Sequence, residues 1–245
     1  MATPSKTQFL TEVHTLLKKR HKLEPSVDKL TILEAVVYGI CHEDATREQA
    51  DAALARFKDG FFDWNEVRVS SLEEIQGIVA GMSDAEGRAF RIRRFLRQLF
   101  EKTYGFNLEP LAKKPQKESV KALEEYDAFS SDYVLATVTR LALAGHAIPV
   151  DAPALRALRR LGVADESTEV PALRGILERA VPKNRGAEFG DLIEALAHDT
   201  CVEGEPDCPR CELRKICPTG QAQKAEAAAG AKAAKGKPGK AKSAE

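Results

Sequence analysis

Apolar residues recur along most of this 245-residue chain at the three- and four-residue spacing that is typical of one face of an α-helix. In the first part of the chain, the apolar stripes lie within residues 9–17, 30–40, 50–57, 75–79 and 90–100. Further along, the spacing fits helices at 117–126, 132–145, 152–161, 170–181 and 187–199. Neither a β-hairpin signal nor an internal repeat is present. The pattern therefore predicts an all-α protein.

Two segments lack this spacing. Residues 105–116 form a connector rich in proline and lysine. Residues 221–245 consist mainly of Ala, Lys and Gly, with six Lys and two Glu. Such a composition cannot bury a core, so this tail is predicted to be disordered. It either solubilises the protein or acts as a loose phosphate-binding arm.

The charge balance does not favour a nucleic-acid partner. The chain has 37 basic and 37 acidic residues, and 31 basic and 35 acidic residues remain without the tail. A protein that binds duplex DNA gains affinity by neutralising phosphates, so a net negative body is unfavourable. The first ten residues lack a secretory pattern, and the longest apolar stretch, 133–150, contains Arg140 and His146. We therefore expect a cytoplasmic protein without a membrane partner.

Four cysteines lie close together near the C-terminus. Cys201, Cys208, Cys211 and Cys217 leave gaps of six, two and five residues. Four soft sulfur ligands in one loop suit a [4Fe–4S] cluster or a structural zinc ion. Zinc sites usually use two C-x-x-C pairs, and only one is present here, so the spacing favours iron–sulfur. Disulfides or free thiols are the remaining alternatives.

This cysteine spacing resembles the iron–sulfur loop of the endonuclease III branch of the helix-hairpin-helix DNA glycosylases, which includes adenine and mismatch thymine glycosylases. The resemblance covers most of residues 1–217. It implies a helical barrel domain at 25–146 that ends in a degenerate helix-hairpin-helix. It also implies a cluster domain at 147–220, with residues 1–24 as a helix packed on it and 221–245 as the tail. The implied partner is double-stranded DNA, bound by a monomer and associated with the nucleoid. The implied cofactor is a structural [4Fe–4S] cluster.

Asp151 is the candidate catalytic carboxylate. The apolar run 147–150 ends at Asp151, and Pro153 follows in the first turn of a predicted helix. This pattern is similar to the one that carries the family's catalytic Asp. A carboxylate there can stabilise positive charge at C1′ of a flipped nucleotide or activate a nucleophile. Without the resemblance, an Asp at this place is an ordinary helix N-cap.

Tyr133 takes the position at which lyase-competent members of the family carry a Schiff-base lysine. No lysine lies between Lys121 and Asp151. The mismatch thymine glycosylases are similar in having Tyr there and retaining the Asp. The resemblance therefore implies a monofunctional N-glycosylase, without abasic-site lyase activity, in which Tyr133 shapes the pocket near the anomeric carbon. Otherwise Tyr133 is a packed residue in the first turn of a helix.

The DNA-binding hairpin departs from the family pattern. Its two glycines, which let backbone N–H groups approach a phosphate, are absent. Ser130 and Ser131 occupy this turn and can cap the next helix or contact DNA, but Asp132 adds a negative charge.

The cluster loop is altered as well, with acidic residues at 203, 205 and 207 where the family has bases. Arg210, Arg214 and Lys215 follow and are candidate phosphate contacts. Cys41 falls near the family's base-contact position, or it is a buried core cysteine. These departures leave a second function open, that of a catalytically inactive iron–sulfur binding or interaction module.

Overall fold

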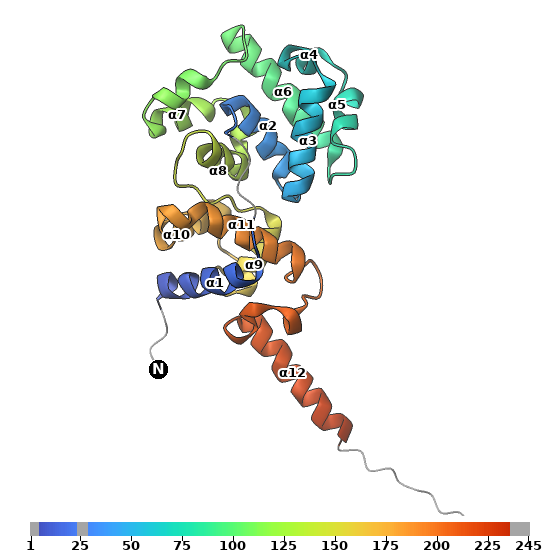
Figure 1. Cartoon of the computed structure of the whole chain (residues 1–245), viewed down its shortest axis with the longest axis vertical. Helices are drawn as coiled ribbons and strands as arrows, with labels where there is room; N and C mark the ends of the chain where they lie inside the picture. The colour runs from blue at the N-terminus through green and yellow to red at the C-terminus, as the bar shows by residue number, and fades with distance from the viewer. Residues whose placement is uncertain (1–4, 24–28, 236–245) are drawn as a thin grey trace, which may run out of the picture.

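The computed structural model describes residues 5–23 and 29–235, with side chains up to residue 228, and these residues form two lobes in an elongated molecule (Figure 1). No strand occurs in these two ranges, which confirms the all-α class predicted by the apolar spacing. The α-helices are α1 Lys6–Arg20, α2 Ile32–His42, α3 Arg47–Gly60, α4 Trp64–Val69, α5 Leu72–Ile78, α6 Ala85–Thr103, α7 Gln116–Leu123, α8 Asp132–Leu141, α9 Ala152–Arg160, α10 Val170–Ala180, α11 Lys183–Asp199 and α12 Pro218–Lys235. Short 3₁₀ helices are η1 Glu109–Lys113, η2 Asp127–Ser130, η3 Cys208–Arg210 and η4 Glu212–Lys215.

Local sequence fixes where several helices begin. Four of them start with a capping box, in which the N-cap hydroxyl accepts a bond from the N3 backbone N–H and the N3 side chain accepts one from the N-cap N–H. The pairs are Ser5–Gln8, Thr31–Glu34, Thr46–Gln49 and Ser71–Glu74. Each box satisfies two N–H groups that would otherwise lack a partner.

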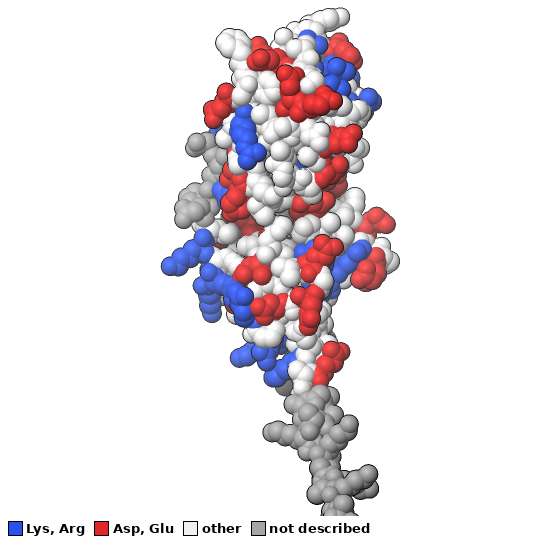
Figure 2. Space-filling view, turned by 90° about the vertical axis from the view of Figure 1, so that its right-hand side faces the viewer, with Lys and Arg blue, Asp and Glu red and all other residues white. Residues whose placement is uncertain are grey.

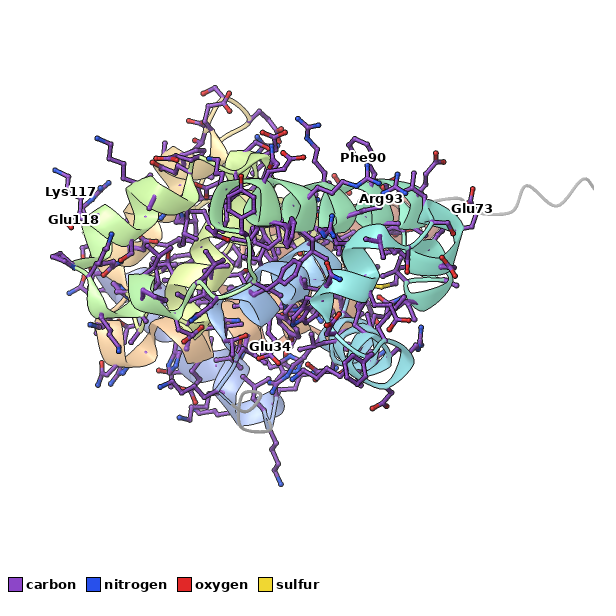
Figure 3. The ribbon with its side chains drawn as sticks, turned by 90° about the horizontal axis from the view of Figure 1, so that it is seen from above. Glu34, Glu73, Phe90, Arg93, Lys117 and Glu118 are labelled. Carbon is purple, nitrogen blue, oxygen red and sulfur yellow. The ribbon has the colours of Figure 1, made fainter. Side chains whose placement is uncertain are left out.

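The first lobe consists of α2 to α8, with α2 at its centre. Every residue of α2 except Glu34 is buried, as expected for a helix that is apolar all round. Gly39 allows α2 to approach α8 closely, because a Cβ atom there would lie 3.4 Å from the Cα of Val134. Figure 3 shows α6 crossing the top of this lobe, with Phe90 and Arg93 on its outward face.

The second lobe is built by α1, α9, α10 and α11 and lies below the first in Figure 1. α1 comes from the opposite end of the sequence, yet Leu10, Val13 and Leu17 are buried in the same core as Phe189 and Leu192 of α11. This core extends to Leu213 and Cys217, so the cysteine loop is packed onto the lobe. The amphipathic pattern of α1 could not identify this partner, because it shows only that one face is apolar.

Two parts of the chain differ from the sequence-based prediction. The short helix α4 was not expected. α12 runs through Lys235, within the tail that was predicted to be disordered from residue 221, and residues 236–245 lie outside the described part. The physical reason is the high helix propensity of alanine, which dominates this segment. None of the described helices combines the length and the apolar character needed to cross a membrane.

Candidate active site

Asp151 lies at the start of α9, between the two lobes. Its Oδ1 accepts a hydrogen bond of 2.9 Å from the backbone N–H of Ala154, and Pro153 occupies the first turn. The residue is 9% exposed. Asp151 is therefore a helix N-cap, as its sequence context predicts. The capping bond engages only Oδ1 of the Asp151 carboxylate. Asp151 also lines a cavity.

This cavity, of about 20 Å³, brings together residues from both lobes. Tyr133 and Arg140 come from α8, and Asp151 comes from α9. The remaining lining residues are Pro149, Ala154, Gly190, Asp191 and Glu194. Tyr133 and Asp151, identified separately along the sequence, thus share one interlobe cavity.

Burial controls the protonation of both candidate catalytic residues. It raises the pKa of Asp151; the Ala154 N–H bond opposes this rise, while the negative charges of Asp44 and Glu194 add to it. Burial also raises the pKa of Tyr133 well above its usual value, and the charge of Asp151 adds to that effect. Tyr133 is therefore a neutral phenol at physiological pH and is not a source of phenolate.

Two ion pairs flank the cavity, and sequence reasoning identified neither. Arg140 donates a 2.7 Å hydrogen bond to Asp191. Glu194 accepts bonds from Nε2 of His42 at 3.0 Å and from the backbone N–H of Arg47 at 3.1 Å. Burial alone would raise the pKa of Glu194, but the hydrogen bond from His42 and the electrostatic contributions of His42, His198 and Arg140 outweigh it, so the pKa is lowered. The only local sequence signal was a row of three acids at three-residue spacing on α11, namely Glu188, Asp191 and Glu194.

The predicted DNA-binding serines lie at the turn before α8. Ser131 is the N-cap of α8, and its hydroxyl donates a 2.6 Å hydrogen bond to Glu43. Ser130 is exposed, and its hydroxyl donates to the carbonyl of Asp127 at 2.8 Å. Ser131 is thus occupied within the protein, while Ser130 remains accessible to a phosphate.

Cys41 is fully buried in the core of the first lobe, with 0% exposure. Burial raises its pKa to about 12. A buried thiol offers no surface to a base, so the structure favours the alternative interpretation of Cys41 as a core residue.

A cleft of about 590 Å³ opens between the two lobes, near the C-terminal end of α2. Its charged lining includes four acidic and three basic residues, namely Glu43, Asp44, Asp84, Glu203, Arg88, Arg91 and Arg156. All three arginines donate to acceptors within the protein, which reduces the positive charge available to a ligand. On the face shown in Figure 2, acidic side chains are spread over the upper and central parts, and larger basic groups lie toward the lower end.

The four clustered cysteines line one cavity beneath α9. Cys208 and Cys217 are buried, and Cys201 and Cys211 are half-buried. Arg160 holds the loop by donating to the carbonyls of Val202 and Gly204, each at 2.7 Å. The structure shows all five cysteines as free thiols, with no disulfide among them.

The donor chemistry of this cavity fits a thiolate-bound metal centre. Burial raises the pKa of Cys208, and the neighbouring Cys217, Cys211 and Cys201 raise it further, which reflects their proximity. As the side chains stand, no group of three or more His, Cys, Asp or Glu within the described residues has an arrangement that would hold a metal ion. The thiols therefore share a cavity without being gathered around one point.

The three predicted phosphate contacts of the cluster loop, Arg210, Arg214 and Lys215, differ in their exposure and in their ion pairs. Arg210 is exposed but pairs with Asp207 at 3.2 Å and with Asp199 at 3.8 Å. Arg214 is half-buried, and Lys215 is exposed on η4. Lys215 is thus exposed like Arg210, but within the described residues no ion pair engages it.

Comparison with known proteins supports the resemblance that the cysteine spacing suggested. No family model matches the sequence. The chain is 24% identical over 220 residues to endonuclease III of Synechocystis sp., covering 89% of this chain and 95% of that protein.

Solved structures of glycosylases share its fold. A non-covalent endonuclease III–DNA complex matches with a TM-score of 0.72 at 17% identity, over 91% of this chain and 100% of that one. A thermostable thymine-DNA glycosylase matches with a TM-score of 0.63 at 17% identity, over 88% and 96% of the two chains. The similarity along most of the sequence and the shared fold together confirm the resemblance to the endonuclease III-like branch of the helix-hairpin-helix glycosylases.

Proposed function

We propose that the protein is a DNA N-glycosylase of base excision repair that removes a damaged or mismatched base from double-stranded DNA. One observation carries the proposal: Asp151 and Tyr133 line the same interlobe cavity in a chain with the endonuclease III fold. The likeness to endonuclease III and to a thymine-DNA glycosylase supports this reaction class.

In this proposal the enzyme is monofunctional. A target nucleotide is flipped into the interlobe cleft, and the Asp151 carboxylate stabilises positive charge at C1′ as the base departs. Tyr133 packs near the anomeric carbon, and because it is not an amine it cannot form a Schiff base. The cavity of about 20 Å³ is smaller than a base, so the lobes or their side chains must move when DNA binds.

We also propose a [4Fe–4S] cluster held by Cys201, Cys208, Cys211 and Cys217. Four thiols that line one cavity supply the soft ligands that such a cluster requires. A bound cluster would cross-link a polar loop that contains only short 3₁₀ turns. The cysteine loop would then belong to the proposed cluster domain, residues 147–220, on which residues 1–24 would pack. Residues 25–146 would form the barrel domain.

The proposed DNA contacts are Ser130, Arg210, Arg214 and Lys215, with Ser131 acting mainly as a helix cap. We propose a monomer that works in the cytoplasm at the nucleoid.

A catalytically inactive iron–sulfur binding module is the second candidate function. The acidic residues of the interlobe cleft, Glu43, Asp44, Asp84 and Glu203, favour it because they oppose the approach of phosphates. The small size of the cavity around Asp151 favours it as well.

A panel of duplexes distinguishes these functions. The substrates carry oxidised pyrimidines, uracil, G·T and G·A mismatches or an abasic site, and each product is analysed with and without alkali. Strand breaks that appear only after alkali support a monofunctional glycosylase. Breaks without alkali would refute the assignment of Tyr133, and absence of both product and binding at low salt would favour the inactive module.

A further inference from the structure

We propose that Glu194 is a second catalytic carboxylate and that, together with Asp151, it binds the water molecule that hydrolyses the glycosidic bond. This inference rests on the proposed glycosylase function and specifies its nucleophile. The geometry that carries it is the polar cavity shared by Asp151 and Glu194.

The cavity has the size and the chemistry of a water site. Its volume of about 20 Å³ accommodates a single water molecule, for which roughly 10–15 Å³ is the minimum. A buried water also needs two to four polar partners. Asp151, Glu194, Tyr133 and Arg140 all line the cavity and can provide them.

Glu194 is held in place by contacts that keep it ionised. Nε2 of His42 lies 3.0 Å from its Oε1, and the backbone N–H of Arg47 donates to the same oxygen at 3.1 Å. Both donors belong to the first lobe, whereas Glu194 belongs to α11 of the second. Its lowered pKa keeps the carboxylate ionised at neutral pH.

Asp191, which lines the cavity, and Asp44, which lies nearby, already accept hydrogen bonds from other groups of the protein. Arg140 neutralises Asp191 through a 2.7 Å bond. Oδ1 of Asp44 accepts the backbone N–H of Ala152 at 2.9 Å. The two bonds to Glu194 engage the same oxygen, Oε1, so of the acids that line the cavity Glu194 is the one best placed to share a water molecule with Asp151.

The reaction balances without another reactant. The water oxygen forms a bond to C1′ as the C1′–N bond breaks, and the bonding electron pair leaves with the base. One water proton passes to Glu194 and then to the departing base. Asp151 stays ionised and offsets the charge that develops on the sugar.

Glu194→Gln tests this role, because glutamine keeps the size and a hydrogen-bonding oxygen but cannot accept the proton. Glu188→Gln is the matched control, since Glu188 lies on the same helix and pairs with His14 and Lys18 on the α1 side. Single-turnover excision is measured on the best duplex of the panel, together with binding to a duplex that contains a tetrahydrofuran abasic-site analogue. We expect Glu194→Gln to slow excision by about 10²–10³-fold with binding unchanged, and the control to stay within about twofold of the wild type.

A second variant separates catalysis from folding. In Glu194→Ala, added formate supplies a small carboxylate, and we expect it to restore part of the excision rate. Equal rates for Glu194→Gln and Glu188→Gln would overturn the proposal while leaving the glycosylase function intact. Loss of both excision and analogue binding, without rescue by formate, would identify a structural role and also overturn it. A wild-type protein that neither excises nor binds would instead refute the proposed function, and this inference with it.

Discussion

Arg174 donates hydrogen bonds of 2.9 Å to both carboxylate oxygens of Asp132, joining α10 of the second lobe to the first residue of α8. Asp132 is the acid that the sequence places in the degenerate hairpin, where a phosphate would approach. Bidentate pairing with a guanidinium offsets its charge and fixes its orientation. The acidic hairpin is thus less repulsive to DNA than its sequence suggests.

Replacing Arg174 by Gln should expose this negative charge. We expect Arg174→Gln to weaken duplex binding at low salt more than Arg179→Gln, which removes the same charge from an exposed position on the same helix. The broken pair should also lower the free energy of unfolding by about 1–2 kcal/mol. Fluorescence anisotropy at several salt concentrations and urea denaturation measure the two effects. Equal affinities for the two variants would show that Asp132 does not face the DNA.

Asp151→Asn should separate activity from stability. Burial raises the pKa of Asp151 in the folded state, so the folded state is more stable when this carboxyl group is protonated. The ionised carboxylate therefore lowers the free energy of unfolding at pH 7. Asparagine is neutral and can still accept the Ala154 N–H bond, so we expect a higher Tm than that of the wild type at pH 7. Excision should be lost.

The Tm advantage of Asp151→Asn should shrink as the pH falls. The wild-type carboxylate takes up its proton as the pH passes down through its raised folded-state pKa, and the cost of burying the charge then disappears. Comparing the two proteins at each pH cancels the contribution of all other groups. An asparagine variant that is less stable than the wild type at both pH 7 and pH 4.5 would contradict the assignment of a costly buried charge.

Iron content tests the cysteine assignment. We expect protein purified without oxygen to contain about four irons per chain, as a [4Fe–4S] cluster requires. Cys208→Ser should lose this iron, and Cys41→Ala should retain it, because Cys41 lies in the separate core of the first lobe. Stoichiometric zinc in the wild-type protein would instead support the alternative that the cysteine spacing leaves open.

The features that the sequence predicts well are those encoded within a few residues. Helix positions follow from a spacing of three to four residues, and the capping role of Asp151 follows from Pro153 two positions later. By contrast, His42 and Glu194 are separated by 152 residues, and Asp132 and Arg174 by 42. Nothing local in the sequence marks such partners, so the second carboxylate of the candidate site emerged only from the structure, in which His42 of α2 contacts Glu194 of α11.

Arg88 shows that an arginine in a regular helical row can be buried. It lies near Arg91 and Arg94 on one side of α6, an arrangement typical of an exposed basic face, yet it is 4% exposed. Its guanidinium donates to the backbone carbonyl of Cys41 at 3.0 Å and to that of Ser83 at 2.7 Å. Arg88 therefore satisfies a carbonyl group at the end of α2, where the helix supplies no partner, and another in the turn before α6.

Arg88→Ala should consequently be among the most destabilising single substitutions in the first lobe. Several buried carbonyls would lose their donor, at about 1–3 kcal/mol each, so we expect a loss of about 3 kcal/mol or more in urea denaturation. Arg97→Ala, at an exposed position on the same helix, should change stability by no more than about 0.5 kcal/mol. Because the end of α2 carries His42, which contacts Glu194, the Arg88 variant should also slow excision under conditions where it remains folded. Equal stability of the two variants would show that water can replace the guanidinium at these carbonyls.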